Sequence, residues 1–64
     1  MSDNPIRLEE LRRKRHWSQN LLAELSGVSR QTIRNIESGA YDVKASTLIA
    51  LSKALECDVK DLFF

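Results

Sequence analysis

In the middle of the chain, apolar residues recur with helical spacing in two short runs that a turn separates. Ser18 stands where a helix N-cap is expected, and Gly27 can take the left-handed backbone conformation that ends a helix abruptly. Ser29 stands at the cap position of the second run, in which Ile33 and Ile36 share one face at i, i+3 spacing. The pattern predicts two short helices, the second with one face packed on a core.

The opposite face of this second helix carries long polar side chains. They are Arg30, Gln31, Arg34 and Asn35. A small residue, Ala23, stands in the first helix where two crossing helices approach closely, and the turn glycine and the two isoleucines complete the spacing of a helix-turn-helix. A helix divided in this way has one face for the core and one for a partner.

The flanking segments also predict helices. A first helix is expected over residues 6–16, with Leu8 and Leu11 on one side. Another is expected over residues 45–55, because four of its residues share one face at i, i+3, i+4 and i+7. These are Leu48, Leu51, Ser52 and Leu55.

The chain is expected to end in a short helix over residues 59–63, for which Asp58 supplies the cap. We therefore expect a compact all-α fold of five helices, without repeats or low-complexity tracts. A chain of 64 residues makes one domain over residues 1–64, and we expect residues 1–5 to be a flexible N-terminus.

Charge is distributed unevenly along the chain, although the net charge is only +1. Residues 1–40 hold seven Lys and Arg against five Asp and Glu, whereas residues 41–64 hold three against four. A DNA-facing surface needs cationic charge, and the half with the two central helices has the excess. The alternative for the cations of residues 12–15 is that they only solvate the first helix.

Cys57 is the only cysteine and His16 the only histidine. They can form neither an internal disulfide nor a zinc site, and we expect no metal or other cofactor. No Gly-rich phosphate loop and no nucleophile with its base occur, so we expect no enzymatic activity and no small-molecule ligand. No apolar run reaches the roughly 20 residues that span a bilayer, and residues 1–7 lack the apolar region of a signal peptide. We therefore expect a cytoplasmic protein without membrane contact.

Three motifs of the central segment together resemble one family. They are QxxLA at Gln19, Leu22 and Ala23, SGVSRQTI over residues 26–33, and IExG at Ile36, Glu37 and Gly39. By these residues the chain resembles the phage lambda-repressor/Cro family, also called the Xre family, and the resemblance extends over residues 6–63. It implies a five-helix DNA-binding domain with the helix-turn-helix at helices 2 and 3.

The resemblance also implies which side chains contact DNA. Arg30, Gln31 and Asn35 match the main base-reading positions, where arginine suits guanine O6 and N7 and the amides suit adenine N6 and N7. Gln19 matches a position that grips the phosphate backbone, and the alternative for each phosphate candidate is a solvated polar side chain. The phosphate or secondary contacts expected are Gln19, Ser29, Thr32, Arg34, Ser38 and Tyr41.

Other positions are assigned structural roles. Arg12 and Glu37 match a partly buried ion pair that ties helices together in this family, and the alternative is two ordinary surface charges. Trp17 directly precedes a helix cap, where a hydrophobic staple packs on the core, and the alternative is base stacking.

Several residues depart from the family pattern. Among them, Leu21 is expected to expose an apolar side chain, and Glu56 to occupy a left-handed cap at a cost of roughly 1 kcal/mol. Val43 and Lys44 replace a frequent Pro-Ser, which leaves the start of the helix over residues 45–55 poorly defined.

The chain closes with three consecutive apolar residues, Leu62, Phe63 and Phe64, which so small a monomer cannot fully cover. We expect them to form the interface of a homodimer, and the alternative for Phe63 is that it folds back on the core. Two recognition helices about 34 Å apart would read a palindromic operator. The chain is interpreted as a sequence-specific transcriptional regulator, by default a repressor. The alternative is a protein-interaction or antitoxin-type module whose DNA binding is secondary.

Overall fold

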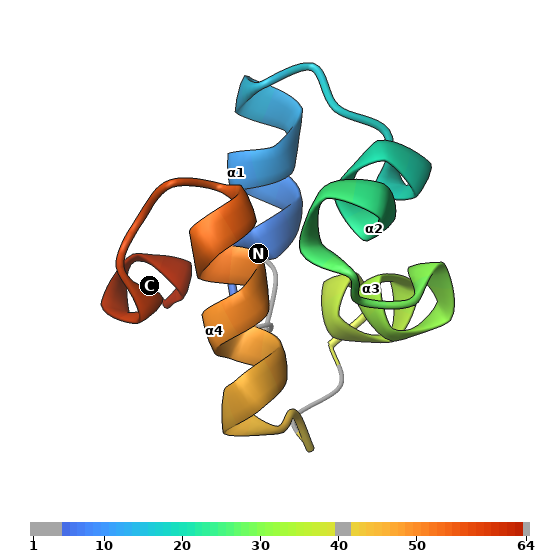
Figure 1. Cartoon of the computed structure of the whole chain (residues 1–64). Coiled ribbons are helices and arrows are strands. Elements are labelled where there is room, and N and C mark those ends of the chain that lie inside the picture. Colours follow the sequence, from blue (N-terminus) through green and yellow to red (C-terminus); the bar gives the residue numbers. More distant parts are fainter. Residues whose placement is uncertain (1–4, 40–41, 64) are drawn as a thin grey trace.

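The computed structural model describes residues 5–39 and 42–63 of the chain. This part of the chain contains four α-helices and one closing 3-10 helix (Figure 1). They are α1 Leu8–Lys14, α2 Gln19–Ser26, α3 Arg30–Glu37, α4 Ala45–Ala54 and η1 Val59–Leu62. The expectation of an all-helical fold is confirmed. The flexible segment expected over residues 1–5 lies, except for Pro5, outside the described residues.

The expectation of five α-helices is wrong, because the last element is a single 3-10 turn. Its bonds run from i+3 to i: the Asp61 N–H donates to the Asp58 carbonyl at 2.9 Å. The Phe63 N–H likewise donates to the Lys60 carbonyl at 3.2 Å. Phe63 itself is extended, with φ of −111° and ψ of 150°, and this conformation ends the helical geometry.

α1 begins later than the hydrophobic pattern predicts, because the residues before it pair with the C-terminal segment. Ile6 forms an isolated antiparallel bridge with Phe63. The Arg7 N–H donates to the Leu62 carbonyl at 2.8 Å. This pairing holds the chain outside helical geometry, and α1 starts only at Leu8.

Residues with a left-handed backbone follow α1, α2 and α4. Gly27 has φ of +76° and Glu56 has φ of +55°, and both were predicted to end helices in this way. His16, with φ of +59°, was not predicted to do so, and α1 therefore ends at Lys14 instead of continuing to residue 16. A side chain at positive φ strains the backbone, whereas glycine adopts it freely.

One apolar core joins all the elements. Its buried side chains are Ile6, Leu8, Leu22, Ile33, Ile36, Leu51, Leu55 and Leu62. α2 packs on both α3 and α4, α1 packs on α3, and η1 packs on α4 (Figure 1). The inward faces predicted for the second helix of the helix-turn-helix and for residues 45–55 are those that the core buries.

Trp17 packs half-buried against this core in the connection between α1 and α2. The Arg15 guanidinium carbon lies 5.1 Å from the centroid of the Trp17 ring, within the range of a cation–π contact. Arg15 Nη2 also donates to the Leu55 carbonyl at 2.6 Å. The packing on the core and the contact with Arg15 agree with the structural role predicted for Trp17.

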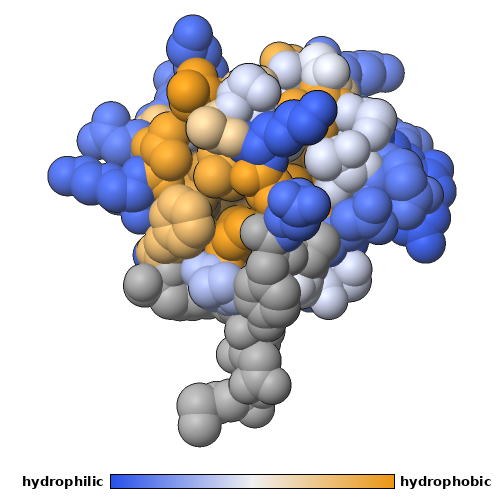
Figure 2. All heavy atoms as spheres, turned by 90° about the horizontal axis from the view of Figure 1, so that it is seen from below, coloured by the Kyte–Doolittle hydropathy of each residue, from blue (hydrophilic) through white to orange (hydrophobic). Residues whose placement is uncertain are grey.

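Hydrophilic side chains cover the right-hand flank of Figure 2, the side on which Figure 1 places α3, and hydrophobic ones gather left of the centre. Within residues 5–39 and 42–63, no helix combines the length and the apolar character that crossing a membrane requires. Over the same ranges, no group of three or more His, Cys, Asp and Glu side chains is placed to share a metal ion.

Candidate nucleic-acid interface

α3 lies with one face on the core and the other in solvent. Ile33 is 0% and Ile36 1% exposed, so both anchor the helix from within. The exposed residues of the helix are Arg30, Gln31, Arg34 and Asn35. The polar face that the spacing predicts is therefore presented as one surface.

Ser29 fixes the start of α3. Its Oγ accepts from the Thr32 N–H at 3.1 Å and donates to Thr32 Oγ1 at 2.8 Å. In this cap Ser29 and Thr32, both of which were expected to contact DNA, are bonded to each other. It leaves Arg30 and Gln31, the first two residues of the helix, exposed at the end that enters a groove most deeply in helix-turn-helix docking.

Further along α3, two exposed amides are bonded to each other. Gln31 Nε2 donates to Asn35 Oδ1 at 3.0 Å, one turn away. Arg34 lies in the last turn, and Ser38 follows as the C-cap. The Ser38 hydroxyl donates to the Asn35 carbonyl at 3.0 Å. Tyr41, the other contact expected beyond α3, lies outside the described residues.

The N-terminus of α2 lies beside that of α3. A shallow hollow is lined there by Ser18, Gln19 and Asn20 together with Arg30. Ser18 is the predicted N-cap, and its Oγ accepts from the Leu21 N–H at 3.0 Å. The first N–H groups of a helix have no intrahelical partner and carry partial positive charge, so this hollow beside a guanidinium suits an anion. Sequence reasoning missed Asn20, because only the packing of α2 on α3 brings it beside Arg30.

The side chain of Gln19 has a protein partner that the sequence did not reveal. Gln19 Nε2 donates to Glu37 Oε1 at 3.0 Å. Glu37 also accepts from Arg12, with Nε 2.8 Å from Oε2 and Nη2 3.0 Å from Oε1. Arg12 Nη1 completes the network by donating to the Trp17 carbonyl at 2.6 Å. The network joins α1, the start of α2 and the end of α3.

The ion pair in this network is withdrawn from solvent. The side chains of Arg12 and Glu37 are 10% and 5% exposed. The hydrogen bond to Glu37 raises the pKa of Arg12 above its ordinary value, although burial acts in the opposite direction. Arg12 is therefore cationic at any pH near neutrality, and its charge is paired with that of Glu37 inside the protein.

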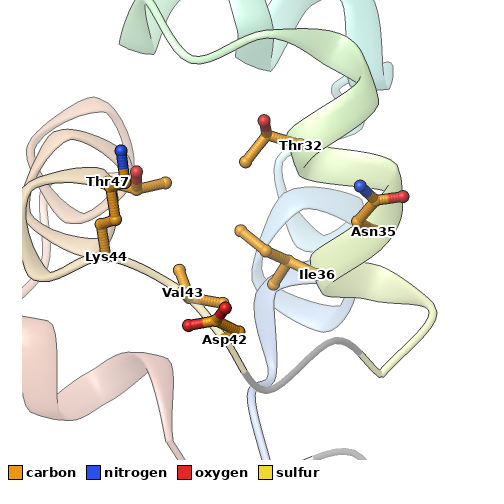
Figure 3. Close-up of a pocket in the computed structure, with 7 residues that line it drawn as sticks. All are labelled: Thr32, Asn35, Ile36, Asp42, Val43, Lys44 and Thr47. Atoms are coloured by element: carbon orange, nitrogen blue, oxygen red, sulfur yellow. The ribbon is translucent and has the colours of Figure 1, made fainter.

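A second hollow, of about 290 Å³, separates the edge of α3 from the start of α4 (Figure 3). It is lined by Thr32, Asn35 and Ile36 and, on the facing side, by Asp42, Val43, Lys44 and Thr47. Lys44 is the N-cap residue of α4 and makes no capping bond with its side chain. Sequence reasoning missed Lys44 and Thr47 as neighbours of α3. The hollow is lined by the negative charge of Asp42 as well as by the positive charge of Lys44. It therefore suits an anion less well than the hollow at the start of α2 does.

The C-terminal residues expected at a dimer interface differ in their exposure. Leu62 is 0% exposed, because η1 packs on α4 and inserts this side chain into the core. The expectation of Leu62 at an interface is therefore corrected: its side chain cannot meet a partner. Phe63 is 40% exposed, although its backbone is bridged to Ile6. Phe64 lies outside the described residues.

Large apolar side chains are also exposed where the sequence pattern did not predict it. Leu25 of α2 is 52% and Ile49 of α4 45% exposed, and both line a shallow hollow between these helices. Leu21, which was expected to expose an apolar side chain, is 36% exposed. The surface between α2 and α4 is therefore a further apolar area besides Phe63.

Comparison with known proteins agrees with this geometry. Residues 8–62 match the family described as Helix-turn-helix. The chain belongs to this family, and its helix-turn-helix is of the lambda-repressor/Cro type, as the resemblance implied.

Individual relatives come from several bacteria. The chain is 36% identical over 53 residues, 83% of its length, to the competence pilus inhibition repressor of Acinetobacter baylyi, and it spans about half (48%) of that protein. It is 34% identical over 58 residues to the uncharacterized HTH-type transcriptional regulator YgzD of Bacillus subtilis, covering 91% of this chain and 88% of the relative. The solved structure of the restriction-modification controller protein C.AhdI from Aeromonas hydrophila superimposes with a TM-score of 0.83 at 37% identity, over 89% of this chain and 86% of its own.

Proposed function

We propose that this chain is a sequence-specific DNA-binding transcriptional regulator whose α3 enters the major groove. The observation that carries the proposal is the division of α3 between a buried apolar face and an exposed face of four long polar side chains. The major groove admits an α-helix and shows each base pair as a distinct pattern of donors and acceptors. Similar proteins named as a repressor and as a transcriptional regulator support the same function. A protein that acts in this way, in the cytoplasm and without enzymatic activity, is what we propose.

Arg30, Gln31 and Asn35 are proposed as the residues that contact bases. A guanidinium donates two bonds to guanine O6 and N7, whereas an amide both accepts and donates at adenine N6 and N7. Because Arg30 also lines the hollow at the start of α2, it can hold a phosphate there instead of a guanine. Thr32 and Arg34 are assigned secondary contacts.

Phosphate contacts are proposed on both sides of α3. At the start of α2, the side chain of Gln19 is already bonded within the protein, so we assign its contact to the backbone N–H. Asn20 borders the same hollow. Beyond α3, the candidates are Ser38, Tyr41 and Lys44. Such contacts fix the register of the protein on DNA without reading sequence.

A homodimer is proposed as the form that binds DNA and represses by occluding polymerase. A single domain of this kind buries only about 600 to 1,000 Å² on DNA, which is little for tight operator binding. The 40% exposure of Phe63 supports the C-terminal end, with Phe64, as the dimer interface. A two-fold dimer with α3 helices about 34 Å apart would require a palindromic operator.

A second function is favoured by a separate observation. The exposed side chains of Leu25 and Ile49 offer an apolar surface away from the polar face of α3. Exposed apolar surface of this kind marks contacts with other proteins. The alternative proposal is therefore a protein-interaction or antitoxin-type module whose DNA binding is secondary.

Selection of bound duplexes from a randomised DNA pool, at near-physiological salt, tests the main proposal. We expect a palindrome whose half-sites lie about one helical turn apart. Retention without any sequence motif, weakened steeply by salt, would show only non-specific electrostatic binding and would contradict the proposal.

Alanine substitution distinguishes the two functions and the two kinds of DNA contact. Replacing all of Arg30, Gln31, Arg34 and Asn35 should abolish DNA binding and leave binding to a protein partner intact. Gln31→Ala alone should weaken operator binding by about 1 to 3 kcal/mol and relax preference at one base pair. Asn20→Ala should weaken binding to all sequences alike, as loss of a phosphate contact does.

A further inference from the structure

The two amide side chains on the exposed face of α3 are not independent of each other. Gln31 Nε2 donates to Asn35 Oδ1 at 3.0 Å, and both residues are exposed. Residues four positions apart are neighbours on a helix surface, so the bond needs no backbone adjustment. An exposed pair of this kind adds little to helix stability. Its larger consequence is that it selects one orientation of the Gln31 amide.

The orientation of an amide decides what it can read. To bind adenine with two bonds, the amide oxygen must accept from N6 and the amide nitrogen must donate to N7. Half a turn about the terminal bond exchanges oxygen and nitrogen. A carbonyl oxygen such as Asn35 Oδ1 can only accept, so while it faces Gln31 it holds the nitrogen of Gln31 on its own side and leaves Oε1 on the other. An Asn35 amide turned over would present its donor Nδ2 instead, so the selection depends on the orientation of Asn35 as well.

The orientation of the Asn35 amide agrees with this role. In Figure 3 its nitrogen lies on the side of the hollow between α3 and α4, and its oxygen is turned away from that hollow. After the bond is formed, Gln31 retains one N–H and its carbonyl oxygen. These two groups form an edge with one donor and one acceptor, which is the complement of adenine in the major groove.

We propose that Asn35 is a positioning residue for Gln31 and that the two side chains read a single adenine as one unit. In this unit Gln31 Oε1 accepts from adenine N6, Nε2 donates to N7, and Asn35 keeps the amide from turning over. The inference rests on the proposed function, because it requires α3 to lie in the major groove. It replaces the role of Asn35 as an independent base reader.

The test uses the full chain and the operator selected from random DNA. Affinity is measured for that operator and for its three single-base variants at the pair whose preference Gln31→Ala relaxes. Asn35→Ala should reduce the preference for adenine at this same pair about fivefold or more, because the Gln31 amide becomes free to turn. Asn35→Asp keeps an oxygen that accepts from Gln31 Nε2. This variant should therefore retain the preference for adenine, although its added negative charge lowers affinity for all DNA.

Arg34→Ala is the matched control, because Arg34 is an exposed neighbour of Asn35 on the same helix. Because Arg34 is assigned a secondary DNA contact, this variant should lower affinity for the operator and its three variants alike, so that the preference at the Gln31 pair does not change. An unchanged preference in Asn35→Ala, additive effects in the Gln31/Asn35 double variant, or a guanine at this pair in the selected operator would each overturn the inference. Failure to select any motif would overturn the proposed function itself. Thermal unfolding of every variant separates these outcomes from loss of the fold.

Discussion

The Arg12 guanidinium and the Glu37 carboxylate face each other edge to edge, with two hydrogen bonds of 2.8 and 3.0 Å. The third guanidinium nitrogen of Arg12 donates to a backbone carbonyl, and Glu37 receives a further bond from Gln19. The pair is almost fully enclosed and connects α1 with the end of α3. The position of α3, and with it that of its polar face, therefore depends on a contact that the last residue of this helix makes with α1.

Removing one partner of this pair should destabilise the fold severely. We expect Glu37→Ala to lower the free energy of unfolding by about 3 kcal/mol or more, because the buried Arg12 charge is left without its partner. The double variant Arg12→Met with Glu37→Leu should lose less than Glu37→Ala alone. Urea unfolding followed by circular dichroism measures both.

Glu9→Ala is the control for this experiment. It removes an ion pair in which Glu9 Oε1 lies 3.0 Å from Arg13 Nη2, with side chains 43% and 72% exposed. Exposed pairs contribute little, so the change should stay below about 1 kcal/mol. If Glu9→Ala and Glu37→Ala lowered the free energy of unfolding equally, burial of an ion pair would not be what determines its contribution to stability.

Relief of backbone strain at Glu56 should stabilise the protein. Glu56 has φ of +55°, and replacing it with glycine should raise the free energy of unfolding by about 1 kcal/mol. Its exposed ion pair with Arg15, at 3.8 Å, offsets little of this gain. Glu56→Ala is the matched control, because it loses the same ion pair and keeps the strain. A higher urea midpoint for the alanine variant than for the glycine variant would contradict the prediction.

Two apolar residues of α4 should contribute very differently to the stability of the fold. Leu51 is 0% exposed, and Leu51→Ala should cost about 2 to 5 kcal/mol through lost burial and the cavity left behind. Ile49, on the same helix, is 45% exposed, so Ile49→Ala should change stability by less than about 0.5 kcal/mol. Thermal unfolding by calorimetry compares the two variants. Similar losses would mean that the register of α4 differs from the one described.

The Cys57 thiol should make stability depend on pH in the alkaline range. Burial raises the pKa of Cys57, and the carboxylate of Asp61 acts in the same direction. The folded state therefore binds the thiol proton more tightly than the unfolded state. Below the ordinary thiol pKa this contribution is fully present, and it is lost as the pH rises through the higher pKa of the folded state.

Comparison of the natural sequence with Cys57→Ala isolates this effect. The difference in unfolding free energy between the two should shrink or change sign as the pH rises, because only the natural sequence loses the thiol contribution. At pH 8, iodoacetamide should also alkylate the folded protein more slowly than the urea-unfolded chain, since the thiolate is the reactive form. Equal alkylation rates would contradict the shift.

Self-association should depend on Phe63 if the proposed dimer interface is right. Phe63→Ser is expected to shift a dimer to a monomer in sedimentation velocity. The fold should remain, because the side chain is 40% exposed and the contact with Ile6 is a backbone bridge. Leu25→Ser tests the other apolar surface. If Leu25→Ser dissociates the dimer and Phe63→Ser does not, the interface lies on the surface between α2 and α4 instead.

The features that the sequence predicted correctly are governed by local chemistry. Ser18 and Ser29 cap their helices because their hydroxyls accept from N–H groups only three positions ahead. Gly27 ends α2 through its own backbone freedom. The faces of α3 and α4 follow from helical periodicity alone. Signals of this kind lie within one or two helical turns and can be read without knowledge of the packing.

The features that the sequence did not predict depend on contacts between distant segments. The bond of Gln19 to Glu37 and the approach of Arg30 to Asn20 exist only once α2 and α3 are packed. The burial of Leu62 likewise depends on the docking of η1 against α4. In the candidate site, the exposed face of α3 could be predicted. The neighbours that surround it could not, because they come from other helices.

The bridge between Ile6 and Phe63 has a consequence for how the domain unfolds. It pairs residues near the two ends of the described chain, so the intervening segments form one closed loop. Closing a long loop costs entropy, which is recovered only when the segments inside it are packed together. No subset of the helices gains this contact by itself, and we expect a single cooperative transition with equal calorimetric and van't Hoff enthalpies. The polar face of α3 is then presented in full or not at all.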